Sequence, residues 1–104
     1  MRLQKEKIIN VIKHDATDCG YYCRNGQYCV IGGLLKAAGC DVETVIPPWE
    51  NSTHIHNLNH DVRALLKSAY GLSLESAYEL QQINDRNLLI TKRREELIKY
   101  VNEL

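Results

Sequence analysis

The stretch from Tyr28 to Gly39, Y-C-V-I-G-G-L-L-K-A-A-G, constrains the fold more than any other segment, because only Lys36 in it is charged. A helix that is apolar on nearly every side belongs in the centre of a protein. Gly32 and Gly33 lower the helix propensity, but with the two alanines that follow they form a small-residue surface that another backbone can approach. Gly39 stands where a left-handed C-terminal cap is needed. We therefore expect a buried central helix over residues 28–39.

Four further segments carry apolar residues at helical spacing. These segments are residues 3–13, 59–70, 73–83 and a last one that runs to the C-terminus. Asn59 and Ser73 are typical N-cap residues, and Gly71 is a typical helix end. The sequence thus predicts a mainly α fold, a small orthogonal bundle of about five helices around the buried central helix. A chain of 104 residues is expected to form a single domain over residues 1–104, since domains typically contain ~100–150 residues.

The last helix has two candidate starts. Thr91 is a good N-cap for a separate helix, whereas Asp85 would cap an unbroken helix from Arg86. The choice between the two starts decides whether the three basic residues after Thr91 lie in the first turn of a helix or in its middle.

A short β-hairpin is an optional addition to the bundle. Residues 14–27 lack a helical period, and Asn25-Gly26 predicts a type I′ turn, whose central positions favour positive φ. Such a turn places Cys23 opposite Tyr28. Two short strands alone are only marginally stable, so the hairpin would need support from the helices.

Cys40–Leu58 is predicted to be a loop, because Pro47-Pro48 cannot continue a helix. Val45-Ile46 and Trp49 are expected to fold back over the core. Trp49 has a second, equally favoured interpretation, as an exposed aromatic anchor for a protein partner.

Thirteen Lys and Arg residues balance thirteen Asp and Glu residues. No overall basic field therefore attracts nucleic acid or an anionic membrane, and nucleic acid is not a favoured partner. No apolar run is long enough to span a bilayer, and the first residues are too polar for a signal peptide. We expect a cytoplasmic protein without a membrane role.

Four cysteines, spaced C-x3-C-x5-C-x10-C, are expected to be reduced thiols, because the cytoplasm disfavours disulfides. Only Cys19 and Cys23 have the short spacing of paired zinc ligands. His54-x-His56, joined by His60, is the better zinc candidate, since alternate residues of an extended segment project to one side. Plain loop histidines are the favoured interpretation, so no cofactor is expected and zinc is the alternative.

Cys29 is the candidate nucleophile. It lies at or near the first turn of the central helix, where partial positive charge lowers a thiol pKa. A neighbouring imidazole would complete the pair used by cysteine hydrolases. The apolar residues that follow favour a buried, structural thiol instead.

A small nucleotide-like ligand is a further candidate. Lys92, Arg93 and Arg94 in the first turn of a helix would oppose the macrodipole, and a bound phosphate would offset that cost. Tyrosines near the hairpin offer stacking surfaces for a base. The candidate ligand-binding residues are Tyr21, Tyr22, Tyr28, Arg86, Lys92, Arg93 and Arg94. The competing interpretation is an ordinary solvated face.

Residues 26–39, G-Q-Y-C-V-I-G-G-L-L-K-A-A-G, resemble the G-x-[WY]-C-[AV]-[IL]-G-[AG]-L-x-x-A-A-G phrase of a family of short, uncharacterised proteins from bacteria and their phages. In that family an Asn-Asp pair precedes a final amphipathic helix, and Asn84-Asp85 looks similar. The resemblance implies an architecture and a phage association, without an established activity. Asn84-Asp85 can tie the end of one helix to the start of the next through side-chain-to-backbone hydrogen bonds.

We therefore expect a non-enzymatic accessory or regulatory protein, related to phage proteins, that binds a host protein or a small ligand. A homodimer through the apolar C-terminal stripe is compatible with this expectation. The alternative is a small thiol- or zinc-dependent hydrolase that uses Cys29 or the His54/His56/His60 loop.

Overall fold

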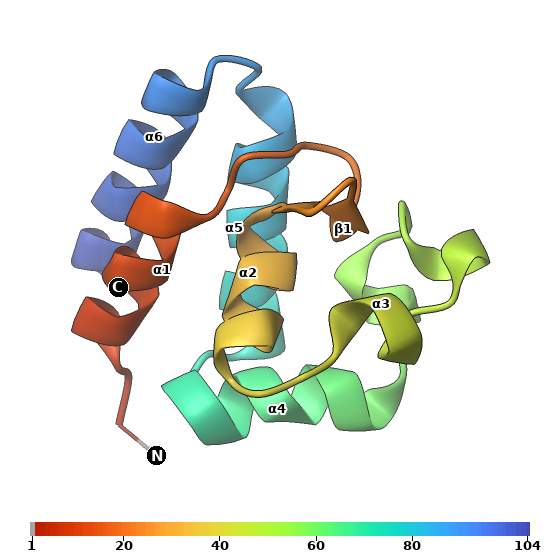
Figure 1. The fold of residues 1–104 in the computed structure, drawn as a ribbon. Coiled ribbons are helices and arrows are strands. Elements are labelled where there is room, and N and C mark those ends of the chain that lie inside the picture. The colour runs from red at the N-terminus through yellow and green to blue at the C-terminus, as the bar shows by residue number, and fades with distance from the viewer. Residues whose placement is uncertain (1) are drawn as a thin grey trace.

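The computed structural model describes residues 2–104. Its elements are, in order, α1 (Lys5–His14), β1 (Cys23–Arg24), β2 (Gln27–Tyr28), α2 (Val30–Ala37), α3 (Val42–Val45), the 3-10 turns η1 (Pro48–Glu50) and η2 (Ile55–Asn57), α4 (His60–Tyr70), α5 (Leu74–Arg86) and α6 (Ile90–Glu103). Helix α2 lies in the middle, with α1, α4 and α5 packed against it, and α6 covers α1 and α5 (Figure 1). The predicted mainly α bundle around a central helix is confirmed.

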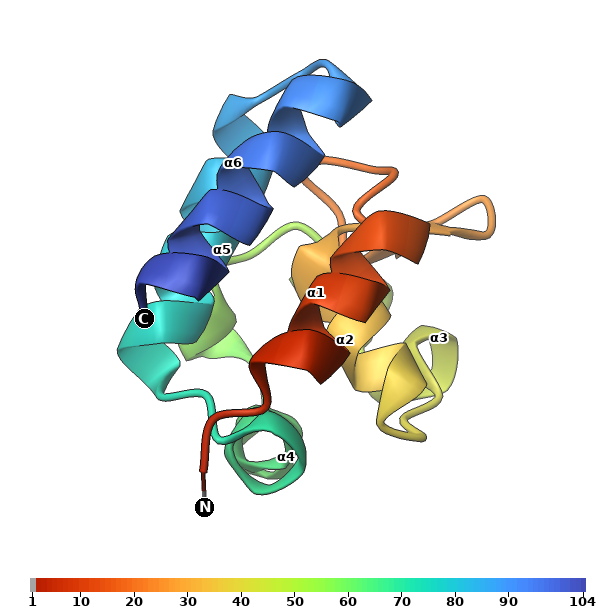
Figure 2. The ribbon, with the colours of Figure 1, turned by 90° about the vertical axis from the view of Figure 1, so that its left-hand side faces the viewer.

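Figure 2 shows α1 and α6 side by side, with α4 crossing nearly end-on below them. This crossing gives the bundle its orthogonal character. Within residues 2–104, none of the helices combines the length and apolar character needed to cross a membrane.

Helix α2 has the buried environment that its composition predicts. Its side chains Val30, Ile31, Leu34 and Leu35 are fully buried. The helix begins later than expected, because Tyr28 belongs to β2 and Cys29 is the extended N-cap. Its last carbonyls accept hydrogen bonds from the backbone N–H groups of residues 39 and 40, the pattern of a Schellman motif.

The two glycines of α2 allow close packing, as expected. A Cβ at Gly32 would lie 1.9 Å from the carbonyl oxygen of Tyr22, and one at Gly33 would lie 2.6 Å from Cβ of Asp15. Real Cβ atoms do not approach so closely, so any larger residue at position 32 would displace the segment that carries Tyr22. The segment that leads into the hairpin thus rests directly on α2, through the Tyr22 backbone and the Asp15 side chain.

The predicted hairpin is present and has the predicted register. Cys23 pairs with Tyr28, and both residues of the Asn25-Gly26 turn have positive φ. Arg24 donates two hydrogen bonds to the nearly buried carboxylate of Asp18, with Nη2–Oδ1 at 2.6 Å. This bidentate pair anchors the hairpin to the loop that precedes it.

Helices α4 and α5 begin as the sequence predicts. The Asn59 side chain accepts a hydrogen bond from the backbone N–H of Asp61, and the Ser73 hydroxyl accepts one from that of Ser76. Gly71 ends α4 in the left-handed conformation, with φ 72°. These local signals define the two helices whose junction is discussed below.

Neither predicted start of the last helix is correct. Helix α5 ends at Arg86, and α6 begins at Ile90 with Leu89 as its N-cap. The helix breaks at Asn87, whose backbone is extended, and the Arg93 side chain donates to the carbonyls of Asn87 and Leu88. A guanidinium thus takes the place of the backbone N–H groups that a continuous helix would supply.

The predicted loop over residues 40–58 contains the short helix α3 and two 3-10 turns. Ile46 is buried as expected, but Val45 and Trp49 are exposed, Trp49 at 78% of its surface. The prediction that these two residues cover the core is therefore wrong. Val42 and Ile46, one helical turn apart, already occupy the core-facing side of this segment.

Candidate functional site

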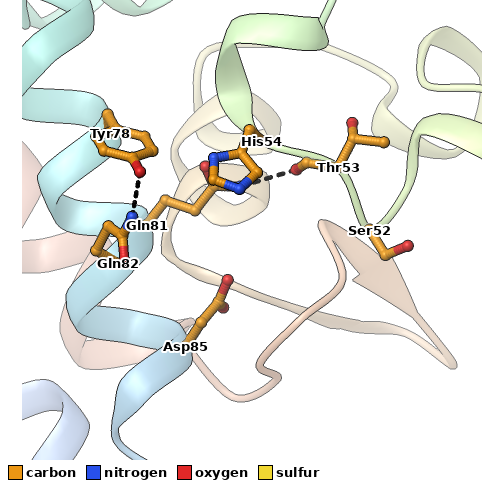
Figure 3. A pocket seen from close by; sticks show the side chains of 7 residues that line it. All are labelled: Ser52, Thr53, His54, Tyr78, Gln81, Gln82 and Asp85. Atoms are coloured by element: carbon orange, nitrogen blue, oxygen red, sulfur yellow. Dashed lines mark hydrogen bonds between the residues drawn. The ribbon is translucent and has the colours of Figure 1, made fainter.

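A polar pocket of about 130 Å³ lies between the loop before η2 and one side of α5. Figure 3 shows loop residues facing helix residues across it. The lining residues are Ser52, Thr53, His54, Tyr78, Gln81, Gln82 and Asp85. Pockets for small organic ligands usually measure ~300–1,000 Å³. This pocket is therefore the right size for one small polar group rather than a nucleotide.

The base of this pocket is a closed hydrogen-bond network around Gln81. Its amide nitrogen donates to Tyr22 Oη (2.8 Å) and to the Thr53 carbonyl (3.1 Å), and its amide oxygen accepts from the backbone N–H of Ile55 (2.9 Å). The Tyr22 hydroxyl in turn donates to the Thr53 carbonyl at 2.7 Å. These buried groups hold the 53–55 segment on α5.

One wall of the pocket is aromatic. The His54 ring stacks on Tyr78, with centroids 5.5 Å apart, and His56 lies 5.0 Å from the same ring at a tilted angle. Gln82 donates to the Tyr78 hydroxyl. The two histidines therefore pack on one tyrosine instead of converging on a common point.

Asp85 closes one end of the pocket, and its neighbour Asn84 makes a long-range connection. Asn84 accepts from the backbone N–H of Val30 (2.9 Å) and donates to the Asp18 carbonyl (3.0 Å), while Asp85 Oδ1 accepts from the backbone N–H of Gly20 (2.9 Å). The predicted tie between consecutive helices is thus wrong. The pair instead fastens α5 to the start of α2 and to the loop of residues 18–20.

The Cys29 thiol lies in a crevice with Tyr22 and Asp85 that has no room for a water molecule. Cys29 is 3% exposed, and this burial raises the pKa of its thiol to about 12, despite a hydrogen bond from the backbone N–H of Gly32 that lowers it. The sulfur is therefore protonated at neutral pH. Burial therefore outweighs the N-terminal position, and Cys29 is a structural cysteine that caps α2.

The candidate zinc ligands His54, His56 and His60 lie in two separate environments. His54 and His56 lie against Tyr78, whereas His60 begins α4, with its Nδ1 3.8 Å from the Asp61 carboxylate. In the part of the chain that the structure describes, no group of three or more His, Cys, Asp or Glu side chains is arranged to hold a metal ion.

The candidate ligand-binding residues do not share one surface. Tyr22 is buried in the network described above, and Tyr21 and Tyr28 have cations of the chain itself, Arg24 and Lys36, over their rings. On the last two helices, Lys92 pairs with Glu96 at 3.0 Å, Arg94 donates to the Asp15 carbonyl, and Arg86 is exposed.

Arg93, the centre of the basic trio, is 3% exposed. It donates to the carbonyls of Ala16 (2.6 Å), Asn87 (2.9 Å) and Leu88 (3.0 Å). Ala16 has a positive φ of 61°, which is uncommon for a residue other than glycine. Arg93 therefore joins the α1–β1 loop to the α5–α6 connection.

The connection that Arg93 holds carries a feature that sequence reasoning missed. Leu88 is 79% exposed, Leu89 75% and Ile90 38%. We call these three residues the Leu88–Ile90 turn. The sequence does contain a signal for this exposed turn, namely three consecutive apolar residues between two predicted helices. Such a run is ordinarily assigned to the buried core. With its backbone held by a buried guanidinium, the turn presents apolar side chains to solvent in a defined geometry.

Comparison with protein-family models, with curated proteins and with solved structures finds no match for this chain. The resemblance of residues 26–39 to the phrase of short bacterial and phage proteins therefore stays a prediction.

Proposed function

We propose that this protein is a non-enzymatic accessory protein that binds a partner protein through the Leu88–Ile90 turn. The observation that carries the proposal is the exposure of Leu88 and Leu89, at 79% and 75%. Isolated exposed leucines are common, but adjacent apolar side chains at the tip of a rigid turn are typical of an interaction surface.

The rigidity of the turn supports binding. Two hydrogen bonds from buried Arg93 fix the carbonyls of Asn87 and Leu88 in the connection, and a third ties the same guanidinium to the Ala16 carbonyl. A preorganised turn loses little conformational entropy when a partner binds, so more of the interaction energy appears as affinity. Since the turn is convex, the partner should offer an apolar groove.

The surroundings of the turn also fit an interface. Exposed Arg86 ends α5, and exposed Lys92 lies in the first turn of α6. An apolar centre with a charged border is the usual anatomy of a protein–protein contact. Exposed Trp49, in the 3-10 turn η1, is a candidate for a second, separate contact.

Two observations favour binding over the alternative hydrolase. The Cys29 thiol is buried with a raised pKa, and His54 and His56 pack on Tyr78. The resemblance to short phage proteins would make the partner a protein of the bacterial host.

Photo-crosslinking in native cells tests the proposal. Benzoylphenylalanine at position 89 should give one discrete adduct with a protein other than this chain, because this side chain would lie inside the contact. The same group at position 44, exposed on α3, is the matched control and should give none. Excess wild-type protein should abolish the adduct, whereas the Leu88→Ser/Leu89→Ser variant should not compete.

Two outcomes would overturn the proposal. Equal competition by the Leu88→Ser/Leu89→Ser variant would show that the leucines do not contribute to binding. An adduct only between two copies of this chain would make the turn a homodimer contact instead.

A further inference from the structure

A second pocket, of about 430 Å³, lies at the junction of α4 and α5, away from the Leu88–Ile90 turn. Its volume is within the range of sites for small organic molecules. Side chains of α4 form one side, and residues 72–74, at the end of the connection and the start of α5, form the other. None of the residues singled out for binding in the sequence lies here except His60.

Arg63 is the unusual residue of this pocket. Its Nε is the one buried side-chain nitrogen or oxygen atom in residues 2–104 that has no hydrogen-bond partner. A buried polar atom without a partner costs roughly 1–3 kcal/mol, so native structures rarely contain one unless a water molecule, an ion or a ligand completes it. The fold thus leaves this Nε unsatisfied and closed to solvent, so an acceptor in the pocket would bind the outer nitrogens of the same guanidinium.

The charges of the pocket indicate the sign of that acceptor. Lys67 lies one helical turn after Arg63 on α4, and His60 lies one turn before it. In the described part of the chain, the ion pairs involve neither Arg63 nor Lys67. The pocket is lined by no Asp or Glu among the described residues. It therefore carries two cationic side chains without a counter-ion.

The rest of the lining is apolar. Leu72 is almost fully buried and lies beside Leu74 and Ala64 in the pocket wall. A ligand here would thus contact cationic groups on one side and aliphatic groups on the other. A free inorganic anion would leave the apolar part unfilled, whereas an anion with an apolar body would fill both parts.

From these observations we infer that the α4–α5 pocket binds a small carboxylate with an apolar body, such as a medium-chain fatty acid or an aromatic acid. The planar guanidinium of Arg63 matches the two oxygens of a carboxylate. Lys67 adds a second positive charge, and the leucines contact the apolar body. This inference does not depend on the proposed partner binding, which concerns a different surface.

The test is a titration of the full chain with octanoate, followed by amide chemical shifts and calorimetry. Octanoate should shift the amide signals of residues 60–74, and octanol, which has the same chain without the charge, should bind at least tenfold more weakly. Arg63→Gln should weaken octanoate binding at least tenfold. Arg86→Gln, at an exposed arginine outside the pocket, is the control and should change the affinity less than twofold.

Three results would overturn the inference. Equal binding of octanol would show that the cations are not used. Unchanged affinity in Arg63→Gln, with its folding verified by thermal denaturation, would remove Arg63 from the site. Tighter binding of octyl phosphate than of octanoate, by tenfold or more, would assign the site to phosphate esters instead of carboxylates.

Discussion

The α5–α6 connection and the α4–α5 junction each contain an arginine on a helix, and the two arginines have opposite surroundings. Arg93 donates to three backbone carbonyls and holds the connection together. Arg63 has a buried Nε without a partner and lines an open pocket. The first arginine stabilises the fold through its hydrogen bonds, whereas the guanidinium of the second is the group that the proposed carboxylate would bind. In our proposal, one arginine therefore holds the fold together and the other binds a ligand.

The largest expected effect on stability comes from Arg93→Met, which removes the fully hydrogen-bonded guanidinium. Three carbonyls would lose charged donors, so we expect a loss of roughly 3–5 kcal/mol in the free energy of unfolding. For a domain of this size that loss lowers Tm by roughly 15–30 °C. Urea denaturation and calorimetry measure it. Arg86→Met is the control and should stay within about 0.5 kcal/mol; a loss below about 1 kcal/mol in Arg93→Met would refute the structural role.

The next effect concerns the buried thiol at the start of α2. Burial raises the pKa of Cys29 from 9.0 to about 12, so the folded protein keeps a proton that the unfolded chain releases above pH 9. The stability contributed by this thiol is complete below pH 9 and is lost as the pH rises toward 12. Between pH 8 and pH 10 the loss is about 1.4 kcal/mol.

Cys29→Ser isolates this contribution, because a serine hydroxyl retains an N-cap acceptor and does not ionise in this range. Urea denaturation at pH 8 and pH 10 should show a smaller loss in the variant than in the wild type. The same loss in both proteins would mean that other groups account for the alkaline sensitivity.

Arg63→Met should change the free energy of unfolding in the opposite direction to Arg93→Met. The methionine keeps much of the apolar stem and removes the unpartnered Nε, so the free energy of unfolding should rise by about 1 kcal/mol. Lys67→Met, at an exposed position, is the control and should change stability by less than about 0.5 kcal/mol. A destabilisation of Arg63→Met would show that Arg63 supports the fold, and the comparison would fail.

The smallest expected effect on stability belongs to the Leu88→Ser/Leu89→Ser variant. Both leucines are largely exposed, so thermal denaturation should differ from the wild type by less than about 0.5 kcal/mol. Leu97→Ala, at a fully buried leucine of α6, should cost about 2–5 kcal/mol. A comparable loss in the double variant would mean that the turn packs in the fold and does not serve as a free surface.

Much of the architecture follows from local sequence signals. Asn59 and Ser73 cap the helices that they were expected to cap, and Gly71 ends α4 in the left-handed conformation. These signals act between residues a few positions apart, so a sequence pattern captures them. The hairpin register likewise follows from the Asn25-Gly26 turn.

The sites could not be predicted in the same way. Lys92, Arg93 and Arg94 were expected to share a ligand surface, yet Arg93 donates to the carbonyl of Ala16, 77 positions earlier in the chain. Arg63 attracted no expectation, since an arginine on an amphipathic helix is ordinarily solvated. Whether a guanidinium donates to a backbone carbonyl or lines a pocket depends on which loop folds against its helix.

The sequence by itself determined the helices, their caps and the burial of α2, because helical period, capping chemistry and the lack of charge act locally or through the hydrophobic effect alone. The tertiary structure decided the partners of the polar groups: Arg93 with three carbonyls, Cys29 beneath a crevice, and Arg63 with an unpaired Nε. Hydrogen bonds depend on distances of a few tenths of an ångström between segments far apart in the chain. Those distances exist only once the bundle has packed.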